Sequence, residues 1–209
     1  MIIKVCGMRD SKNIRAVEAV GIDWMGFIFW DGSPRFVADT LRYLPTRCKR
    51  VGLFVNQMPQ YIIDCIDYYN LDMVQLHGDE TPVLIDNLRR TMEDMMPGLK
   101  YIKAINISSA ADLEKAKSYQ DSADYLIFDT KAEKVGGNGT QFDWHIVDGY
   151  DGQLPFLLSG GIGPDDAERV KAFRHPKCIG IDLNSKFETS PAIKNVEAIK
   201  TFVNKIKTV

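Results

Sequence analysis

The sequence predicts an α/β protein, folded as a single-domain (β/α)8 barrel with a parallel eight-stranded core. Short hydrophobic segments alternate with amphipathic helical segments along the 209-residue chain, an order typical of a parallel sheet with right-handed crossovers. The alternation occurs eight times, which is the number of units that closes a barrel. No linker or low-complexity segment interrupts it, so we expect one domain over residues 1–209. An open, doubly wound sheet is the structural alternative on pattern alone.

The expected strands are short hydrophobic runs of the kind that parallel sheets bury. They occupy residues 2–6, 23–30, 49–55, 72–77, 100–105, 124–129, 155–161 and 178–183. Because each is followed by a segment with helical spacing, the strands are expected to run in the same direction.

The expected helices follow these strands and cover the outside of the barrel. Asp10 or Ser11 suits the cap of the first helix. Pro164 suits the first turn of the seventh, where Asp165 and Asp166 favour the helix dipole. The expected helices occupy residues 10–21, 37–44, 59–69, 81–92, 109–119, 143–147, 164–173 and 192–207.

Composition excludes several classes of partner. The net charge is −2, with 26% charged residues, so the basic surface typical of nucleic-acid binding is missing. No apolar run approaches the roughly 18 residues of a membrane span. The N-terminus lacks the features of a signal peptide, so a cytoplasmic location is expected. The four cysteines lie far apart without a CxxC pair, which argues against zinc and, in a reducing cytosol, against disulfides.

Polar residues gather where the expected strands end. Active sites of (β/α)8 barrels lie at the C-terminal ends of the strands, and a packed core has no need of ionisable residues there. The residues at these ends are Cys6, the turn 30–35, Asn56, His77, Asn106, Asp129, Ser159, Gly160, Gly161 and residues 182–185. They are therefore the first candidates for binding and chemistry.

Lys4 stands two residues before Cys6 in the first strand. Side chains alternate along a strand, so a Cys6 that faces the barrel mouth implies a Lys4 that faces inward one layer below. A buried lysine needs a partner, and Asp182 and Asp129 are the candidates. The pair could be purely structural, or Lys4 could favour the thiolate of Cys6.

Two loops near the end of the chain predict a phosphate site. Gly160 and Gly161 permit a close backbone approach before a helix N-terminus, and the loops after the last two strands form the usual phosphate cradle of this fold. Asn184 and Ser185 can donate hydrogen bonds there. Two ordinary tight turns are the alternative. We therefore expect a small phosphorylated molecule as the ligand.

A glycine-rich stretch over residues 131–139 follows the sixth strand. It matches neither the GxGxxG nor the GxxxxGK[ST] nucleotide motif. We interpret it as a lid that excludes water from the chemistry, with a plain connector as the alternative.

These features together resemble the phosphoribosylanthranilate isomerase family of tryptophan biosynthesis. The matching stretches run in family order from Lys4 to Glu188, nearly the whole chain. They are KVCGMRD, GFIFWDGSPRFV, VGLFVNQ, VQLHGDE, FDT, GGNGTQFDW, LSGGI and GIDLNSKFE. The ordered set is far more specific than any one of its motifs.

The resemblance implies an Amadori rearrangement that needs no cofactor. We expect it to be the third step from the anthranilate branch of tryptophan biosynthesis. By resemblance, Cys6 is the general base, Asp129 the general acid, and Arg35 the ligand of the substrate carboxylate. It further implies that Gly160, Gly161 and the backbone around Asn184 and Ser185 form the phosphate site. His77 is expected to line the pocket or to fix a loop and not to be the base, and Asp182 is expected among the substrate-binding residues. No metal is implied.

Two other functions remain as alternatives at this point. One is another phosphosugar barrel enzyme such as indole-glycerol-phosphate synthase, whose family depends on Lys and Glu at strand ends, where this chain has Cys6 and Asp129. The other is a barrel that binds phosphate without catalysis. The oligomeric state is open between monomer and homodimer.

Overall fold

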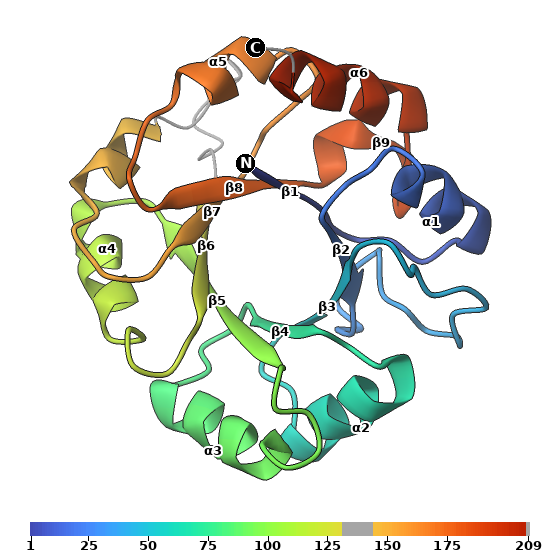
Figure 1. Ribbon diagram of the computed structural model, residues 1–209. Coiled ribbons are helices and arrows are strands. Elements are labelled where there is room, and N and C mark those ends of the chain that lie inside the picture. The colour runs from blue at the N-terminus through green and yellow to red at the C-terminus, as the bar shows by residue number, and fades with distance from the viewer. Residues whose placement is uncertain (131–143, 208–209) are drawn as a thin grey trace.

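Eight parallel strands close into a barrel in the order β1 to β8 (Figure 1). The computed structural model describes residues 1–130 and 144–207, with the side chain of residue 130 left out. The strands are β1 (Ile2–Val5), β2 (Trp24–Ile28), β3 (Lys49–Phe54), β4 (Met73–Leu76), β5 (Lys100–Ile107), β6 (Tyr125–Thr130), β7 (Phe156–Ser159) and β8 (Cys178–Leu183). Because β1 pairs with both β2 and β8, the predicted barrel is confirmed and an open sheet is excluded.

Helices surround the barrel on its outside (Figure 1). Asp10 caps the first of them, because its Oδ1 accepts a hydrogen bond of 2.8 Å from the amide of Asn13. The helices are α1 (Ser11–Glu18), α2 (Pro59–Tyr69), α3 (Pro82–Met92), α4 (Ala110–Lys117), α5 (Ala167–Ala172) and α6 (Val196–Lys207), with 3₁₀ turns η1 (Trp144–Gly149) and η2 (Ser185–Phe187). None of the described helices is long and apolar enough to cross a membrane.

The prediction of a helix over residues 37–44 is wrong. Val37 instead donates its amide to the carbonyl of Ile28, at the end of β2, at 2.9 Å, next to an isolated bridge between Phe36 and Ile28. Farther on, the carboxylate of Glu18 accepts the amides of Thr46 and Arg47 at 2.6 and 2.7 Å. These contacts fix the backbone on both sides of the segment, to β2 before it and to the Glu18 carboxylate after it. A long irregular segment therefore replaces the second helix.

The helix expected over residues 164–173 begins later, at Ala167. Asp166 Oδ2 accepts the amide of Gly163 at 2.7 Å, so a turn closed by this side chain takes the place of the first helical turn. The glycine turn at 160–161 is consequently separated from the helix N-terminus by several residues.

The last helix also begins later than expected, at Val196. A small antiparallel sheet precedes it, formed by β9 (Glu188–Ser190) and β10 (Ile193–Lys194). Asn13 of α1 accepts the amide of Lys194 at 2.8 Å and donates to its carbonyl at 2.9 Å. This pair of bonds ties the hairpin to α1, so the chain is extended here in place of the predicted start of the helix.

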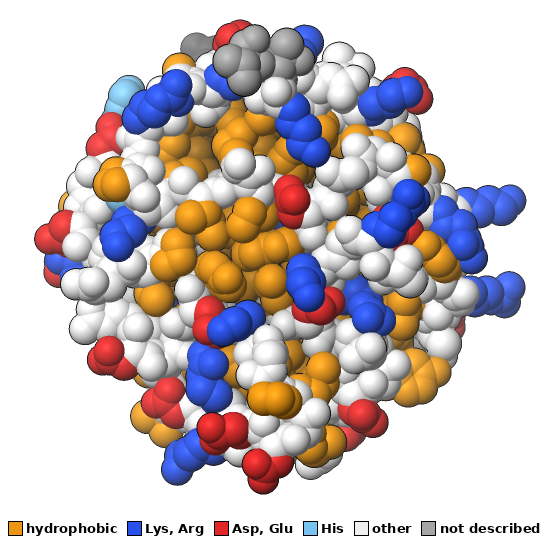
Figure 2. Space-filling model, in the orientation of Figure 1, with side chains coloured by type: hydrophobic (Ala, Val, Ile, Leu, Met, Phe, Trp, Pro, Cys, Tyr) orange, Lys and Arg blue, Asp and Glu red, His pale blue; other side chains and the backbone are white. Residues whose placement is uncertain are grey.

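The barrel interior is closed by hydrophobic side chains near the starts of the strands. In Figure 2 hydrophobic side chains gather over the centre of the ring of strands. The buried members of this layer are Trp24, Val51, Met73, Ile102, Ala104, Ile127 and Leu157. A separate, larger cluster packs the strands against the helices. The apolar layer leaves polar and ionisable residues to the opposite end of the barrel.

Candidate active site

A cavity of about 320 Å³ opens at the C-terminal ends of the strands. Among the predicted site residues, those that line it are Cys6, His77, Asp129, Gly160, Gly161, Asp182, Asn184 and Ser185. The structure therefore brings together eight side chains and glycines that lie up to 179 positions apart in the sequence (185 minus 6). Arg35 is the predicted site residue that does not line this cavity.

Cys6 follows β1 directly and is almost fully buried, with 1% of its surface exposed. A Cβ at Gly26 of β2 would lie 2.7 Å from the Cys6 Sγ atom, so the glycine makes room for the thiol. Burial raises the pKa of Cys6 above its ordinary value, while the charges of Lys4 and Lys194 act in the opposite direction. At neutral pH the resting thiol is consequently protonated, with two cations placed to favour its ionised form.

Lys4 forms a buried ion pair with Asp182, and not with Asp129. Its Nζ atom lies 2.9 Å from Asp182 Oδ2, with exposed side-chain fractions of 0% and 7%. The two residues are direct neighbours in the β1–β8 register. Burial alone would lower the pKa of Lys4. The nearby carboxylate of Asp182 has the larger, opposite effect, so the pKa of Lys4 is raised above its ordinary value. Lys4 therefore stays charged beneath the cavity.

Two buried oxygens at the cavity have no hydrogen-bond partner among the described residues. They are Oδ1 of Asp182 and Oε1 of Gln75, and both residues line the cavity. Buried acceptors of this kind are normally satisfied. They are placed to accept hydrogen bonds from hydroxyl groups of a ligand. The sequence analysis missed Gln75. A polar residue within a hydrophobic strand was the feature that could have indicated it.

His77 lies beside Asp129 at the cavity wall, with 3.3 Å between His77 Nε2 and Asp129 Oδ2. The loop after His77 is held from below by Glu80, whose carboxylate accepts the amides of Asn56 and Gly78 at 2.8 Å each. Lys103 pairs with the same carboxylate at 2.9 Å. His77 is thus mounted on a loop fixed by a buried ion pair.

The glycine turn also lines the cavity. Gly160 and Gly161 have φ angles of 92° and 69°, which side chains with a Cβ rarely adopt. Ser185 begins the 3₁₀ turn η2 beside it, and Lys186 also lines the cavity. Residues of two loops and one lysine therefore line the same space, and their backbone amides and positive charge suit an anion.

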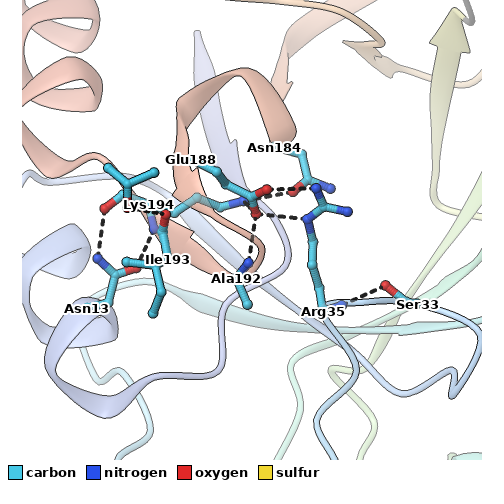
Figure 3. A network of polar contacts seen from close by, with 9 residues as sticks. Asn13, Ser33, Arg35, Asn184, Glu188, Ala192, Ile193 and Lys194 are labelled. Atoms are coloured by element: carbon cyan, nitrogen blue, oxygen red, sulfur yellow. Dashed lines mark hydrogen bonds and ion pairs between the residues drawn. The ribbon is translucent and has the colours of Figure 1, made fainter.

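Arg35 lies next to the cavity, in a polar network that also includes Asn184 (Figure 3). Its Nε and Nη2 atoms donate to the two carboxylate oxygens of Glu188 at 2.8 and 2.6 Å. The hydrogen bond to Glu188 raises the pKa of Arg35 above its ordinary value. The sequence analysis missed Glu188, because nothing in its local pattern separates it from a surface residue.

The proposed lid over residues 131–139 lies outside the described residues. Among those that are described, no three His, Cys, Asp or Glu side chains form a group suited to a metal ion.

A profile of the N-(5′-phosphoribosyl)anthranilate isomerase family matches residues 3–205. The chain belongs to this family. It is 45% identical over 207 residues to the isomerase of Phocaeicola vulgatus, covering 99% of this chain and 98% of the relative. It is 44% identical to the isomerase of Parabacteroides distasonis, covering 99% and 93%.

Solved structures of this isomerase family share the fold. The enzyme of Thermotoga maritima is 30% identical, with a TM-score of 0.82 and full coverage of both chains. A second isomerase structure, 28% identical with a TM-score of 0.81 over the full length of both chains, holds reduced 1-(o-carboxyphenylamino)-1-deoxyribulose 5-phosphate. The predicted isomerase class is confirmed by family membership, in preference to indole-glycerol-phosphate synthase or a non-catalytic barrel.

Proposed function

We propose that this chain converts N-(5′-phosphoribosyl)anthranilate into 1-(2-carboxyphenylamino)-1-deoxyribulose 5-phosphate, with Cys6 as general base and Asp129 as general acid. The observation that carries the proposal is their shared cavity: the thiol and the carboxyl group both line it, with the glycine turn beside them. Family membership supports the reaction. The step number in the pathway and a cytoplasmic location stay predictions.

The first step opens the furanose ring. Asp129, in its protonated form, donates a proton to the ring oxygen while the bond from that oxygen to C1 breaks. The lone pair of the anilino nitrogen forms a C1–N double bond, which gives an iminium ion. His77, 3.3 Å from the Asp129 carboxyl oxygen, is the neighbouring ionisable group that can return a proton to Asp129.

The second step removes the proton on C2, which the iminium ion has made acidic. The thiolate of Cys6 takes this proton, and the electrons of the C2–H bond form the C1–C2 double bond and neutralise the nitrogen. The resulting enolamine loses its O2 proton and gains one at C1, which yields the ketone. One proton is given and one is taken, so no oxidant, reductant or cofactor is needed.

Each of the remaining groups is assigned to the binding of one part of the substrate. Backbone amides around Gly160, Gly161 and Ser185 are suited to the phosphate, since glycines allow the backbone to approach its oxygens. The unpartnered oxygen of Asp182 suits a ribose hydroxyl. Arg35 is assigned to the anthranilate carboxylate, because a guanidinium can hold both carboxylate oxygens.

The test is the loss of substrate fluorescence with the unaltered protein and with Asp129→Asn. We expect turnover by the unaltered protein and a fall in kcat of about 10²-fold in the variant. That is the low end for general acid catalysis, since the anilino nitrogen assists ring opening. Absence of turnover by the unaltered protein would reject the proposed reaction. Full activity in Asp129→Asn would reject the acid role alone.

Gly7→Ala is expected to raise KM by roughly tenfold, about 1.4 kcal/mol of lost binding. A Cβ at Gly7 would lie 2.6 Å from Cδ of Arg35 and 3.0 Å from Oδ1 of Asn184. It would therefore displace both side chains. Gly21→Ala is the matched control, because Gly21 has φ +83 against +80 at Gly7 but nothing within 4 Å of its Cβ position. Steady-state kinetics of both variants separate the steric clash with Arg35 and Asn184 from the strain of a positive φ. Equal KM values in the two variants would contradict the proposed effect of the clash on binding.

The oligomeric state is one of the sequence alternatives that family membership does not decide. The Thermotoga maritima relative, 27% identical in this comparison, is described as dimeric and was crystallised as monomers generated from it. For this chain, both monomer and homodimer remain open predictions.

A further inference from the structure

Glu188 is the centre of the polar network beside the cavity (Figure 3). Its Oε1 atom accepts hydrogen bonds from Arg35 Nε at 2.8 Å, Lys194 Nζ at 2.7 Å and the amide of Ala192 at 3.1 Å. Its Oε2 atom accepts a bond of 2.6 Å from Arg35 Nη2. Only 6% of the Glu188 side chain is exposed. A buried carboxylate with four donors has little freedom to move.

Lys194 holds this carboxylate from behind. Its side chain has no exposed surface, and its Nζ atom also donates to Asn184 Oδ1 at 2.7 Å. The backbone of Lys194 is fixed in turn by both bonds to Asn13 of α1. Lys194 therefore ties Glu188 to Asn184, one of the residues that line the cavity.

The guanidinium of Arg35 donates hydrogen bonds along one of its edges, and its other edge is available to a ligand. Nε and Nη2 face Glu188, whereas Nη1 has no hydrogen-bond partner among the residues that the structure describes. The stem of Arg35 lies against Gly7, directly after Cys6, since a Cβ there would be 2.6 Å from Arg35 Cδ. A planar guanidinium held along one edge presents its other edge in a fixed direction.

The charges of the network do not cancel. Arg35 and Lys194 contribute two positive charges and Glu188 one negative charge, which leaves an excess of one positive charge beside the cavity. Burial alone would raise the pKa of Glu188, but the bonds from Arg35 and Lys194 hold it below its ordinary value. Glu188 therefore stays ionised, and the network suits one incoming carboxylate.

We propose that Glu188, fixed by Lys194, is the positioning residue that aims the remaining edge of Arg35 at the substrate carboxylate. The inference rests on the proposed role of Arg35 as the carboxylate ligand. It makes Glu188 a determinant of specificity for the anthranilate end of the substrate. Glu188 bonds to Arg35, Lys194 and Ala192, whereas the phosphate is assigned to backbone amides around Gly160, Gly161 and Ser185. The effect of Glu188 is therefore expected on ligands that carry the carboxylate.

Positioning and simple charge attraction predict opposite results for one substitution. Glu188→Gln removes a negative charge and raises the net charge of the network from +1 to +2, so attraction alone would strengthen carboxylate binding. If Glu188 aims Arg35, the same change releases the guanidinium and weakens that binding. Glu188→Asp adds a test at constant charge, since it only shortens the arm by one methylene, and it leaves both buried cations paired if Gln impairs folding.

The experiment measures the dissociation constants of two ligands by titration calorimetry. One is reduced 1-(2-carboxyphenylamino)-1-deoxyribulose 5-phosphate, and the other is its phenylamino counterpart without the carboxylate. We expect the unaltered protein to prefer the carboxylated ligand by at least about tenfold, as for a hydrogen-bonded ion pair. Both Glu188 variants should lose most of this preference while the phenylamino ligand binds within twofold of normal. In turnover, KM should rise with kcat little changed.

Glu197→Gln, at an exposed position of α6, makes the same chemical change outside the network and should leave both constants unchanged. An unaltered protein without any preference would remove the role of Arg35 and this inference with it. A normal preference that persists in both Glu188 variants would overturn the inference alone. Stronger carboxylate binding by Glu188→Gln, or equal losses for both ligands, would overturn it as well.

Discussion

Cys6→Ala is expected to lower kcat by about 10³-fold or more, the upper part of the range for a general base. The reason is that the proton on C2 then has no acceptor, while the cavity walls and the phosphate loops remain. KM should change little, because the thiol is assigned to proton transfer and not to binding. Stopped-flow or steady-state fluorescence of substrate consumption measures the effect.

The pH dependence of the unaltered protein gives an independent check on Cys6. Its pKa is raised by burial, so the fraction of thiolate increases with pH through and beyond neutrality. We therefore expect kcat/KM to rise on the alkaline side, up to a pKa above the ordinary thiol value. Cys6→Ser should be strongly impaired, and its residual kcat/KM should lack this rise, because a hydroxyl does not ionise in that range.

Two results would contradict the base role of Cys6. One is a kcat within about threefold of normal in Cys6→Ala, far less than the range expected for a lost general base. The other is a pH profile of Cys6→Ala with the same alkaline rise as the unaltered protein. Cys65→Ala is a suitable control, since Cys65 is also a buried cysteine but packs on α2 in the main core and should leave kcat unchanged.

Strand-level features of the site could be predicted from the sequence. Alternation along β1 was enough to place Lys4 one layer below Cys6, and the buried partner proved to be one of the two aspartates named in advance. Such positions follow from a period of two residues and from the rule that strand ends meet at one end of a barrel. They need no knowledge of the loops.

Loop-level features could not be predicted, because distant side chains decide them. The irregular segment around residues 37–47 depends on the Glu18 carboxylate, which accepts two of its amides. Likewise, the β9–β10 hairpin is held by Asn13, 181 positions before Lys194. Local helical spacing is the only signal visible in these stretches, and tertiary hydrogen bonds override it. The partner of Arg35 was missed for the same reason.

Lys4→Met is expected to destabilise the fold by about 3–5 kcal/mol, the usual cost of leaving one charge of a buried pair without its partner. Asp182 has 7% of its side chain exposed and, among the described residues, accepts a hydrogen bond from Lys4 at 2.9 Å. Methionine keeps the length of the stem, so the loss is electrostatic and not a cavity effect. Urea unfolding at pH 7 measures the free energy directly.

The sign of the pH dependence follows from the raised pKa of Lys4. A group whose pKa is higher in the folded state stabilises the fold at all pH values below its unfolded pKa. It loses that contribution only as the pH rises through the folded value. The Lys4 contribution is therefore fully present at neutrality and fades only above the ordinary lysine value of 10.5. Burial already raises the pKa of Asp182 above its ordinary value, against the opposing charge of Lys4. In Lys4→Met this pKa should rise further, so the deficit should be smaller at low pH, where the lone carboxyl is protonated, and should grow as the pH rises and the carboxyl ionises.

Two further variants separate charge from shape in this pair. Lys4→Met with Asp182→Asn removes both charges and should recover a large part of the lost stability, since the unpaired carboxylate is then gone. Lys12→Met, on the exposed side of α1, makes the same change without burial and should cost under about 0.5 kcal/mol. A double variant no more stable than Lys4→Met would contradict the electrostatic explanation.

Lys4→Met is also expected to change the pH dependence of catalysis. Lys4 is one of two cations that oppose the effect of burial on the Cys6 thiol, so its removal should raise the pKa of Cys6 further. The alkaline rise in kcat/KM should then move to higher pH, with a lower rate at pH 7 in the fraction that is folded. Lys194 still favours the thiolate, so some activity should remain. An unshifted profile would mean that Lys4 serves the fold alone and that Lys194 is the cation that matters for Cys6.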